Sequence, residues 1–311
     1  MSQENLLVLR LISDNTSFKF IKLKLVSFSF SAIVCMASIF SVIFIGLNFG
    51  IDFKGGILLE IRTTSNIGIA EIRNNISNLN IGEVAIQKFG VDSDYLIRVE
   101  KQEGSDNAQQ IAVEAIKSTL NASFGEDIKY RRLEYVGPTV SKDLVSDGVM
   151  AIIFAIIAML AYIWFRFELP FALGAIVALL HDIILTMGVF AVLGLEFNLA
   201  TVAAILLIIG YSMNDTVVVY DRIRENLRKF KKMNLNELLD KSINETLSRT
   251  INTTVTTILA LGALYIFGGQ IIADFAFAML WGIVVGTYSS IFIASPILVY
   301  VNVRRNKETE S

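Results

Sequence analysis

Six stretches of the chain are long and apolar enough to cross a lipid bilayer, and this pattern limits the possible folds more than any other feature. The hydrocarbon core of a bilayer is about 30 Å thick, so a spanning helix needs roughly 20 apolar residues. Of the 311 residues, 54% are hydrophobic and only 18% are charged, which predicts an integral membrane protein. The six stretches are Leu25–Leu47, Val149–Phe165, Leu169–Leu195, Phe197–Tyr220, Ile251–Phe267 and Phe275–Val301.

The basic residues predict how the chain is oriented. The first stretch, residues 25–47, is too long for a signal-peptide core, so we interpret it as an uncleaved span. Lysines precede it within the segment 1–24, the loop 221–250 is rich in Lys and Arg, and the tail 304–311 begins with two arginines. The short turns that would lie on the opposite side contain neither residue type. Because cytoplasmic loops carry an excess of Lys and Arg, we expect both termini in the cytoplasm.

Residues 48–146 are predicted to form a small domain outside the membrane. Their hydrophobic residues come in short runs that read as strand, helix, strand, strand, helix and strand, the order of a ferredoxin-like α+β unit. The expected fold is therefore a six-helix membrane protein carrying one such domain, with spans two to six within residues 147–303. The expected strands are 57–62, 84–89, 95–99 and 129–136, and the expected helices are 67–79 and 108–120.

Several classes of function are excluded by what the chain lacks. It has a single cysteine, Cys35, and a single histidine, His181, which is too few for a zinc site, and we expect no metal or cofactor. No phosphate-binding loop of the G-x-x-x-x-G-K-[ST] type occurs, so the chain is not expected to hydrolyse ATP or to be an enzyme. A net charge of −2 gives no indication of nucleic-acid binding.

Asp215 is the most informative residue, because a carboxylate inside a lipid-spanning segment costs a few kcal/mol or more and marks a functional site. If the fourth span starts outside at Phe197 and the fifth ends outside at Phe267, Asp215 and Arg249 each lie 18 residues from the outer end. That is about 27 Å for both. Two antiparallel neighbours would hold the two at one depth, where an ion pair would keep Asp215 ionised. Alternatively, Arg249 extends to the inner surface and Asp215 caps a broken helix.

Other polar residues of the spans are candidates for the same site. Asn214 adjoins the carboxylate, and Asp182 lies midway along the third span beside His181. Adjacent helical residues point about 100° apart, so at most one of that pair faces a given neighbour. Thr253 and Thr254 belong to a hydroxyl-rich start of the fifth span and could hold water beside Arg249, although such residues also serve helix packing.

Two further patterns are expected to be structural. The glycines at positions 282 and 286 have the G-x-x-x-G spacing of closely packed helices. Within the loop 221–250, leucines and isoleucines repeat at helical spacing after Asn234 and predict a helix at the membrane face.

Several motifs together resemble the SecD/SecF family of bacterial protein export, in the order found in its SecF branch. The similarity covers nearly the whole chain, including the opening LRLISDNT, and the short outer region favours SecF over SecD. The motifs are FGIDFKGG at Phe49–Gly56, VGPTVSKDL at Val136–Leu144, ALLHDIILT at Ala178–Thr186, the Asn214–Asp215 stretch and SRTINTTVTT at Ser248–Thr257.

The resemblance implies a function and a set of partners. Family members share the fold of proton-driven RND transporters, in which two six-span halves pair. It implies that this chain associates with SecD, the SecYEG channel and YajC in the bacterial inner membrane. With SecD it would use the proton-motive force to promote export of preproteins. The residues matching Asp215 and Arg249 are those implicated in proton passage, and we expect Asn214 and Asp182 to contribute.

The expected mechanism couples protonation to movement of the outer domain. Protonation of Asp215 would weaken its interaction with Arg249 and let the spans repack, while Gly50, Gly55 and Gly56 permit a hinge at the entry to the domain. The coupling ion is H⁺, with Na⁺ as an alternative that the nearby arginine disfavours. Rival functions are a passive scaffold for SecD and the channel, and a small-molecule efflux transporter of the RND type.

Overall fold

The structure is a computed structural model that describes residues 16–64, 67–88, 93–102, 106–125, 128–301 and 303. Most of the N-terminal segment and the whole tail 304–311 lie outside the described residues. The chain divides into two units. The helical unit comprises residues 1–48, 151–195 and 200–311, and the sheet domain comprises residues 49–150 together with 196–199.

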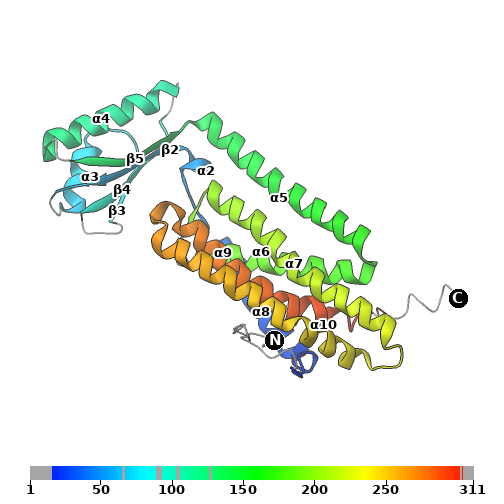
Figure 1. The fold of residues 1–311 in the computed structure, drawn as a ribbon. Coiled ribbons are helices and arrows are strands. Elements are labelled where there is room, and N and C mark those ends of the chain that lie inside the picture. The colour runs from blue at the N-terminus through cyan, green and yellow to red at the C-terminus, as the bar shows by residue number, and fades with distance from the viewer. Residues whose placement is uncertain are drawn as a thin grey trace, which may run out of the picture. The chain divides into compact units, whose positions relative to one another are not determined.

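Helices dominate the described residues, and a four-stranded sheet and a two-stranded pairing interrupt them (Figure 1). Six helical segments of the described residues are long and apolar enough to cross a membrane. In chain order the elements are a 3₁₀ turn Ile21–Leu23, α1 Lys24–Phe44, β1 Asn48–Phe49, α2 Ile51–Lys54, β2 Gly56–Arg62, α3 Ile69–Ser77, β3 Val84–Lys88, β4 Asp94–Val99, α4 Asp106–Phe124, β5 Lys129–Val136, α5 Pro138–Arg166, α6 Leu169–Leu193, β6 Glu196–Phe197, α7 Leu199–Lys229, α8 Leu235–Phe267, α9 Gln270–Ser289, a π turn Ser290–Ala294 and α10 Ser295–Ile297.

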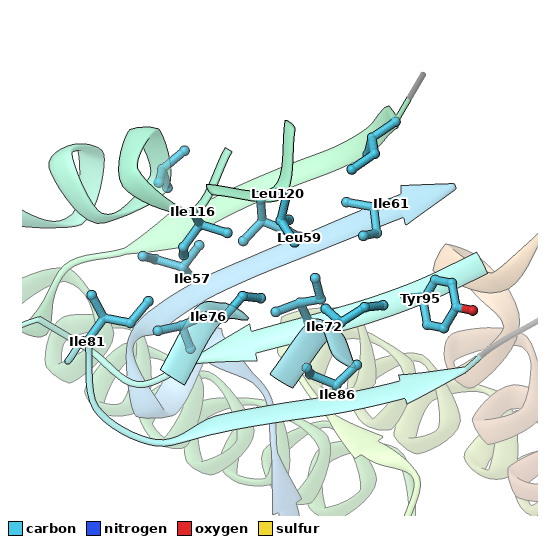
Figure 2. Packing of buried hydrophobic residues seen from close by; sticks show 14 of the residues in the cluster. Ile57, Leu59, Ile61, Ile72, Ile76, Ile81, Ile86, Tyr95, Ile116 and Leu120 are labelled. Atoms are coloured by element: carbon cyan, nitrogen blue, oxygen red, sulfur yellow. The ribbon is translucent and has the colours of Figure 1, made fainter. Parts of the chain in front are cut away.

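The sheet domain has the predicted ferredoxin-like arrangement. Its four strands are antiparallel in the order β3-β4-β2-β5, with α3 and α4 as the two crossing helices. Along the central strand β2, Ile57, Leu59 and Ile61 point to one face, because successive side chains of a strand alternate. Figure 2 shows these three packed with Ile72 of α3 and other apolar side chains. The period-2 pattern of the sequence therefore places one apolar face against the helices.

Charged residues gather on the opposite face of the sheet. Arg62 on β2 lies opposite Asp94 on β4 and donates two hydrogen bonds to its carboxylate, at 2.5 and 2.7 Å. Arg131 adds a third at 3.1 Å and lies 3.4 Å from Glu60. The Arg62 hydrogen bonds hold the pKa of Asp94 below its usual range, although burial opposes this. A carboxylate so paired remains charged in a nearly buried position.

Serines on one side of α1 allow this helix to approach its neighbours. Ser27, Ser31, Ser38 and Ser41 are the buried residues of α1, whereas its large apolar side chains are mostly exposed. α1 contacts α6, where a Cβ added to Gly188 would lie 2.3 Å from the Cβ of Ser38. Small residues on both helices thus permit the close packing that stabilises helices in lipid.

The last span contains a π-helical turn, Ser290–Ala294, which only Ser295 separates from Pro296. Proline has no N–H and cannot continue the hydrogen-bond ladder of an α-helix, so a wider turn before it is favourable. The Ser295 hydroxyl donates to the Ser290 carbonyl at 2.8 Å and satisfies part of the freed backbone. The turn directs Ser290 into the interior of the helical unit, where it is fully buried.

Two predicted boundaries were wrong. The fourth span was expected to start at Phe197, but Phe197 lies in β6 and α7 begins at Leu199, because β6 pairs with β1. The loop 221–250 is largely helical: α7 continues to Lys229 and α8 begins at Leu235. The predicted helix of the loop is therefore one helix with the fifth span. A helix ends where its backbone hydrogen bonds end, which need not coincide with the end of the apolar sequence.

The start of α8 agrees with the prediction from its sequence. The Asn234 side chain caps this helix by accepting a hydrogen bond from the Asn236 N–H at 2.9 Å. The extended ends of α7 and α8 bind each other through polar side chains: Arg222 pairs with Glu245 at 2.7 Å, and Asn226 donates to the Ser242 hydroxyl at 2.9 Å. These contacts stabilise a hairpin beyond the apolar part of the two helices.

Candidate functional site

Asp182 on α6 lies at the centre of a buried polar cluster. Its side chain is fully buried, and three groups from three helices bind it. The hydroxyls of Ser212 on α7 and Ser289 on α9 donate to Oδ2 at 2.5 and 2.8 Å, and Nδ1 of His181 lies 2.9 Å from Oδ1. A buried carboxylate is costly unless hydrogen bonds replace its lost hydration. The cluster therefore links α6, α7 and α9 through one acidic side chain.

His181 and Asp182 bind each other, which the prediction from helical geometry did not anticipate. The 100° offset between them restricts how both could face a third helix, but it allows the ring nitrogen to reach the neighbouring carboxylate. The imidazole also stacks on Tyr288 with 6.0 Å between ring centroids. Its Nε2 is among the buried polar atoms that have no hydrogen-bond partner within the described part of the chain. Within the described part of the chain, the ring is therefore held through Nδ1 and through its face.

Asp215 lies on the same helix as Ser212, one turn further along, and is 4% exposed. The Thr287 hydroxyl of α9 interacts with its carboxylate, and the Thr287 and Thr254 hydroxyls lie 2.9 Å apart. A chain of three polar groups thus runs from α7 through α9 to α8. Predicted residue Thr254 belongs to this chain, and Thr287 joins it to the carboxylate.

Arg249 on α8 acts on Asp215 as a neighbouring charge. It is exposed, and the ion pairs found among the described residues include none between these two side chains. The predicted closeness is present, but the direct ion pair is not.

Among the described contacts, neither Asn214 nor Thr253 binds the Asp215 carboxylate. Asn214 is exposed and lines a cavity of about 410 Å³ between α7 and α5, together with Met159, Tyr162 and Met213. The Thr253 hydroxyl donates to the carbonyl of Thr250 within its own helix. Adjacent positions of a helix point in different directions, so sequence proximity to Asp215 or Arg249 was not sufficient.

A second pair of hydroxyls joins α7 to the π turn of the last span. Thr216 and Ser290 lie 2.7 Å apart, and Ser290 also donates to the backbone carbonyl of Gly286 at 2.9 Å. Close approach of α7 and α9 makes this possible, since a Cβ on Gly286 would lie 2.9 Å from that of Ser212. The predicted packing role of the two glycines is thereby confirmed, as Gly282 contacts Ile208 in the same way.

Sequence reasoning missed Ser289, Ser290 and Thr287 on the last span. All three hydroxyls are directed at residues of the predicted site or its neighbours. A usable signal was present: three hydroxyl residues within four positions of an otherwise apolar segment, beside Gly286. Such residues in a lipid-spanning helix find partners across helix contacts.

The proposed hinge glycines are tightly packed. A Cβ on Gly50 would lie 2.5 Å from a carboxylate oxygen of Glu196, and one on Gly56 would lie 2.4 Å from the Val99 carbonyl oxygen. Gly55 and Gly56 have φ of +73° and +123°, a region that residues with a side chain rarely adopt. The glycines thus permit close approach of the backbone; the hinge itself stays a prediction.

Among the residues that the structure describes, no group of three or more His, Cys, Asp and Glu side chains could hold a metal ion. Asp182 and Asp215 are each surrounded mainly by hydroxyls and neighbouring basic or imidazole groups. What the arrangement offers chemically is two buried carboxylates, each bound by hydroxyls from neighbouring helices. Such groups bind and transfer protons.

Comparisons with known proteins point to one family. A family model described as protein export membrane protein SecD/SecF, C-terminal, matches residues 115–304, and one described as the SecD/SecF GG motif matches residues 40–67. The protein translocase subunit SecF of Rickettsia rickettsii is 47% identical over 306 residues, which cover 96% of this chain and 97% of the relative. SecF of Magnetococcus marinus is 46% identical over 288 residues, covering 92% and 93%.

Solved structures agree with the sequence comparisons. The crystal structure of SecDF, a translocon-associated membrane protein from Thermus thermophilus, is similar with a TM-score of 0.83 and 34% identity, covering 94% of this chain. A super-membrane-facing form of SecDF gives a TM-score of 0.64 and 30% identity. This chain spans 40% of each of those longer chains.

Proposed function

Because this chain belongs to the SecD/SecF family of protein export membrane proteins, we propose that it is the SecF subunit of a bacterial protein translocase, active in preprotein export as a multi-pass protein of the inner membrane. Its relatives of matching length carry the name of that subunit. Its likeness to 40% of a SecDF chain supports SecD as the partner that supplies the remainder. Further partners are the SecYEG channel, YajC and the translocating preprotein. Both termini face the cytoplasm.

The complex uses the proton-motive force, and the observation that carries this proposal is the buried Asp215 within the helical unit. Its carboxylate lies in a lipid-spanning helix, accepts from Thr287 and experiences the charge of Arg249. A proton that crosses a membrane potential of 100 mV gains about 2.3 kcal/mol, which is enough to bias a conformational change between two states of similar free energy.

Proton transfer begins when Asp215 is protonated from the outer side. Neutralising the carboxylate removes its attraction to Arg249, and this change in the balance of charges favours a different packing of α7, α8 and α9. The proton then leaves to the cytoplasmic side and restores the starting state. The outer domain moves with this cycle and helps the preprotein to leave the channel. The positive charge of Arg249 favours H⁺ over Na⁺ as the coupling ion.

Asp182 extends the same pathway. It is joined to α7 through Ser212, one helical turn from Asp215, and to the imidazole of His181. We assign Asp182 and His181 to proton transfer together with Asp215. Asn214 lines the cavity beside α5, and we keep it as a proposed member of the relay because it adjoins Asp215 in sequence.

Export of a secretory precursor into inverted membrane vesicles tests the proposal. Wild type, Asp215→Asn and Arg249→Met are compared at equal complex abundance, with and without an imposed proton gradient. Asp221→Asn is the matched control, because Asp221 is on the same helix but 40% exposed in a surface pair with Arg166. We expect the benefit of the gradient to disappear in the first two variants and to remain in the control.

Each rival function predicts a different outcome. A passive scaffold requires Asp215→Asn and Arg249→Met to respond to the gradient like wild type. An efflux transporter would not copurify with SecD and the channel, and its loss would leave export unchanged. If both charge variants still bind SecD but lose the benefit of the gradient, both rival functions are excluded. That result would support use of the proton-motive force.

A further inference from the structure

The entry segment of the sheet domain holds a segment from far along the chain. The Gly50 N–H donates to the Phe197 carbonyl at 2.9 Å, as part of the pairing between β1 and β6. The rings of Phe49, Phe53 and Phe197 form a triangle with centroids 5.7 to 6.0 Å apart. Aromatic rings at this spacing attract each other in addition to burying apolar area. The four residues Glu196–Leu199 therefore belong to the sheet domain, although they lie between two spans in sequence.

Asp52 caps the helix that follows this segment. Its Oδ2 accepts a hydrogen bond from the N–H of Leu199 at 2.9 Å, across 147 positions of sequence. Leu199 is the first residue of α7, and the first N–H groups of a helix have no partner within the helix. A carboxylate there satisfies one of these groups and also interacts favourably with the positive end of the helix dipole. Asp52 thus binds the first turn of the helix that carries Asp215.

An ion pair fixes the same segment to the sheet. Arg98 on β4 donates to Glu196, and the two side chains are only 22% and 17% exposed. Gly50 leaves room for that carboxylate, as a Cβ at this position would lie 2.5 Å from it. We call Asp52, the three phenylalanines and the Arg98–Glu196 pair the clasp. A partly buried pair is screened less by water than an exposed one and holds its geometry better.

We infer that the clasp couples the sheet domain to α7, with Asp52 as the positioning residue. The inference rests on the proposed function, because it concerns how a change at Asp215 reaches the domain. Asp215 lies 16 residues after Leu199 on one continuous helix. Movement of that helix is transmitted to its first turn, and the clasp ties that turn to β1, α2 and β4. The domain must then follow α7, or the contacts of the clasp must break.

Two substitutions of Asp52 separate the cap from the charge. Asp52→Ala removes the acceptor of the Leu199 N–H, whereas Asp52→Asn keeps an acceptor oxygen and is as good a capping group. Glu71→Ala is the control, since Glu71 is an exposed carboxylate of α3 in the same domain. Amide hydrogen exchange is measured on the complex with SecD, for peptides that cover residues 196–203. We expect about fivefold faster exchange in Asp52→Ala, a change within about twofold in Asp52→Asn, and none in the control.

The same variants are then assayed for export with and without a proton gradient, in parallel with Asp215→Asn. Coupling through the clasp requires Asp52→Ala to lose most of the gradient's benefit while SecD still copurifies, and Asp52→Asn to retain it. If exchange accelerates but the gradient response is unchanged, the cap only stabilises the helix and the inference is overturned. Unchanged exchange in Asp52→Ala would equally overturn it. A full gradient response in Asp215→Asn would instead refute the proposed function, without altering the exchange result.

A charge reversal provides a second test if Asp52→Ala fails to accumulate. Arg98→Glu and Glu196→Arg each place like charges together, and the double variant restores an opposite-charge pair. We expect the gradient's benefit to be reduced in both single variants and recovered in the double variant. No recovery in the double variant, at equal complex abundance, would show that the pair plays no part in coupling.

Discussion

The two units of this protein bury opposite kinds of residue. In the sheet domain the interior is apolar, with Ile72 and Ile76 fully buried, and the charges of Arg62 and Asp94 lie on the far face of the sheet. In the helical unit the interior holds Asp182 and several serines, whereas Phe165 and Phe267 are 91% and 83% exposed. Burial of apolar surface away from water lowers the free energy of folding. Burial away from lipid gives no such gain, because lipid tails are as apolar as leucine. The interior of the helical unit is therefore free to hold polar side chains.

This contrast predicts that different substitutions destabilise the two units. We expect the largest loss of stability from substitutions in the apolar core of the sheet domain. Ile72→Ala leaves a cavity between α3 and the sheet and is expected to destabilise the domain by about 2–5 kcal/mol. Ile111→Ala on α4 is the control, because Ile111 is 66% exposed. Hydrogen exchange of the β2 and β4 amides in the solubilised chain measures both. Equal exchange in the two variants would contradict the assignment of this core.

In the helical unit, fit between helices should matter more than hydrophobicity. A Cβ at Gly188 would lie 2.3 Å from the Cβ and 2.8 Å from the Cα of Ser38, so α1 and α6 must separate to admit it. Gly188→Ala is therefore expected to cost about 1–3 kcal/mol, although alanine is more apolar and a better helix former. That corresponds to a lower melting temperature by roughly 2–4 °C per kcal/mol.

Gly262→Ala is the matched control for that substitution. No atom lies within 4 Å of a Cβ added to this glycine of α8, so the variant is expected to match or exceed the stability of wild type. Thermal unfolding of the solubilised protein compares the two variants. A Gly188→Ala protein as stable as the Gly262→Ala protein would disprove the close contact of α1 with α6.

The smallest expected effect is the pH dependence of the sheet domain, since water screens the half-exposed arginines of its charged face. Arg62 lowers the pKa of Asp94 in the folded state, so the contribution of this pair to stability is present above the unfolded pKa of about 3.9. It is lost as the pH falls through the lower folded pKa. Asp94→Asn should remove this loss, and Asp143→Asn, at an exposed carboxylate, should not. Exchange of the β4 amides below pH 4, corrected for intrinsic rates, tests this.

Much of the fold was predictable because each unit shows a simple pattern. Alternation of apolar residues around Ile57–Ile61 predicted a strand with one buried face, and the order of strands and helices predicted the ferredoxin-like arrangement. The six spans follow from their length and composition. Helix ends were less predictable: α7 begins at Leu199 because β6 pairs with β1, and the two strands are more than a hundred residues apart in sequence.

The candidate site was predicted in part. Asp182 and Asp215 were identifiable because carboxylates are rare in apolar segments. Their partners were not, because Ser212, Ser289 and Thr287 come from different helices and become neighbours only when α7 and α9 pack through Gly282 and Gly286. Asn214 was placed at the carboxylate by sequence distance, but a helix directs adjacent side chains to different surroundings.

The sequence alone determined that this chain spans a membrane, that one small α+β domain interrupts the spans, and that carboxylates lie within the apolar spans. These properties follow from amino-acid composition and from the periodicity of apolar residues, both of which depend only on residues close in sequence. Tertiary structure decided which hydroxyls bind Asp182, that Arg249 influences Asp215 without a direct ion pair, and that Asp52 caps α7. Such contacts join residues distant in sequence, and their existence depends on how closely helices approach and which way each side chain points.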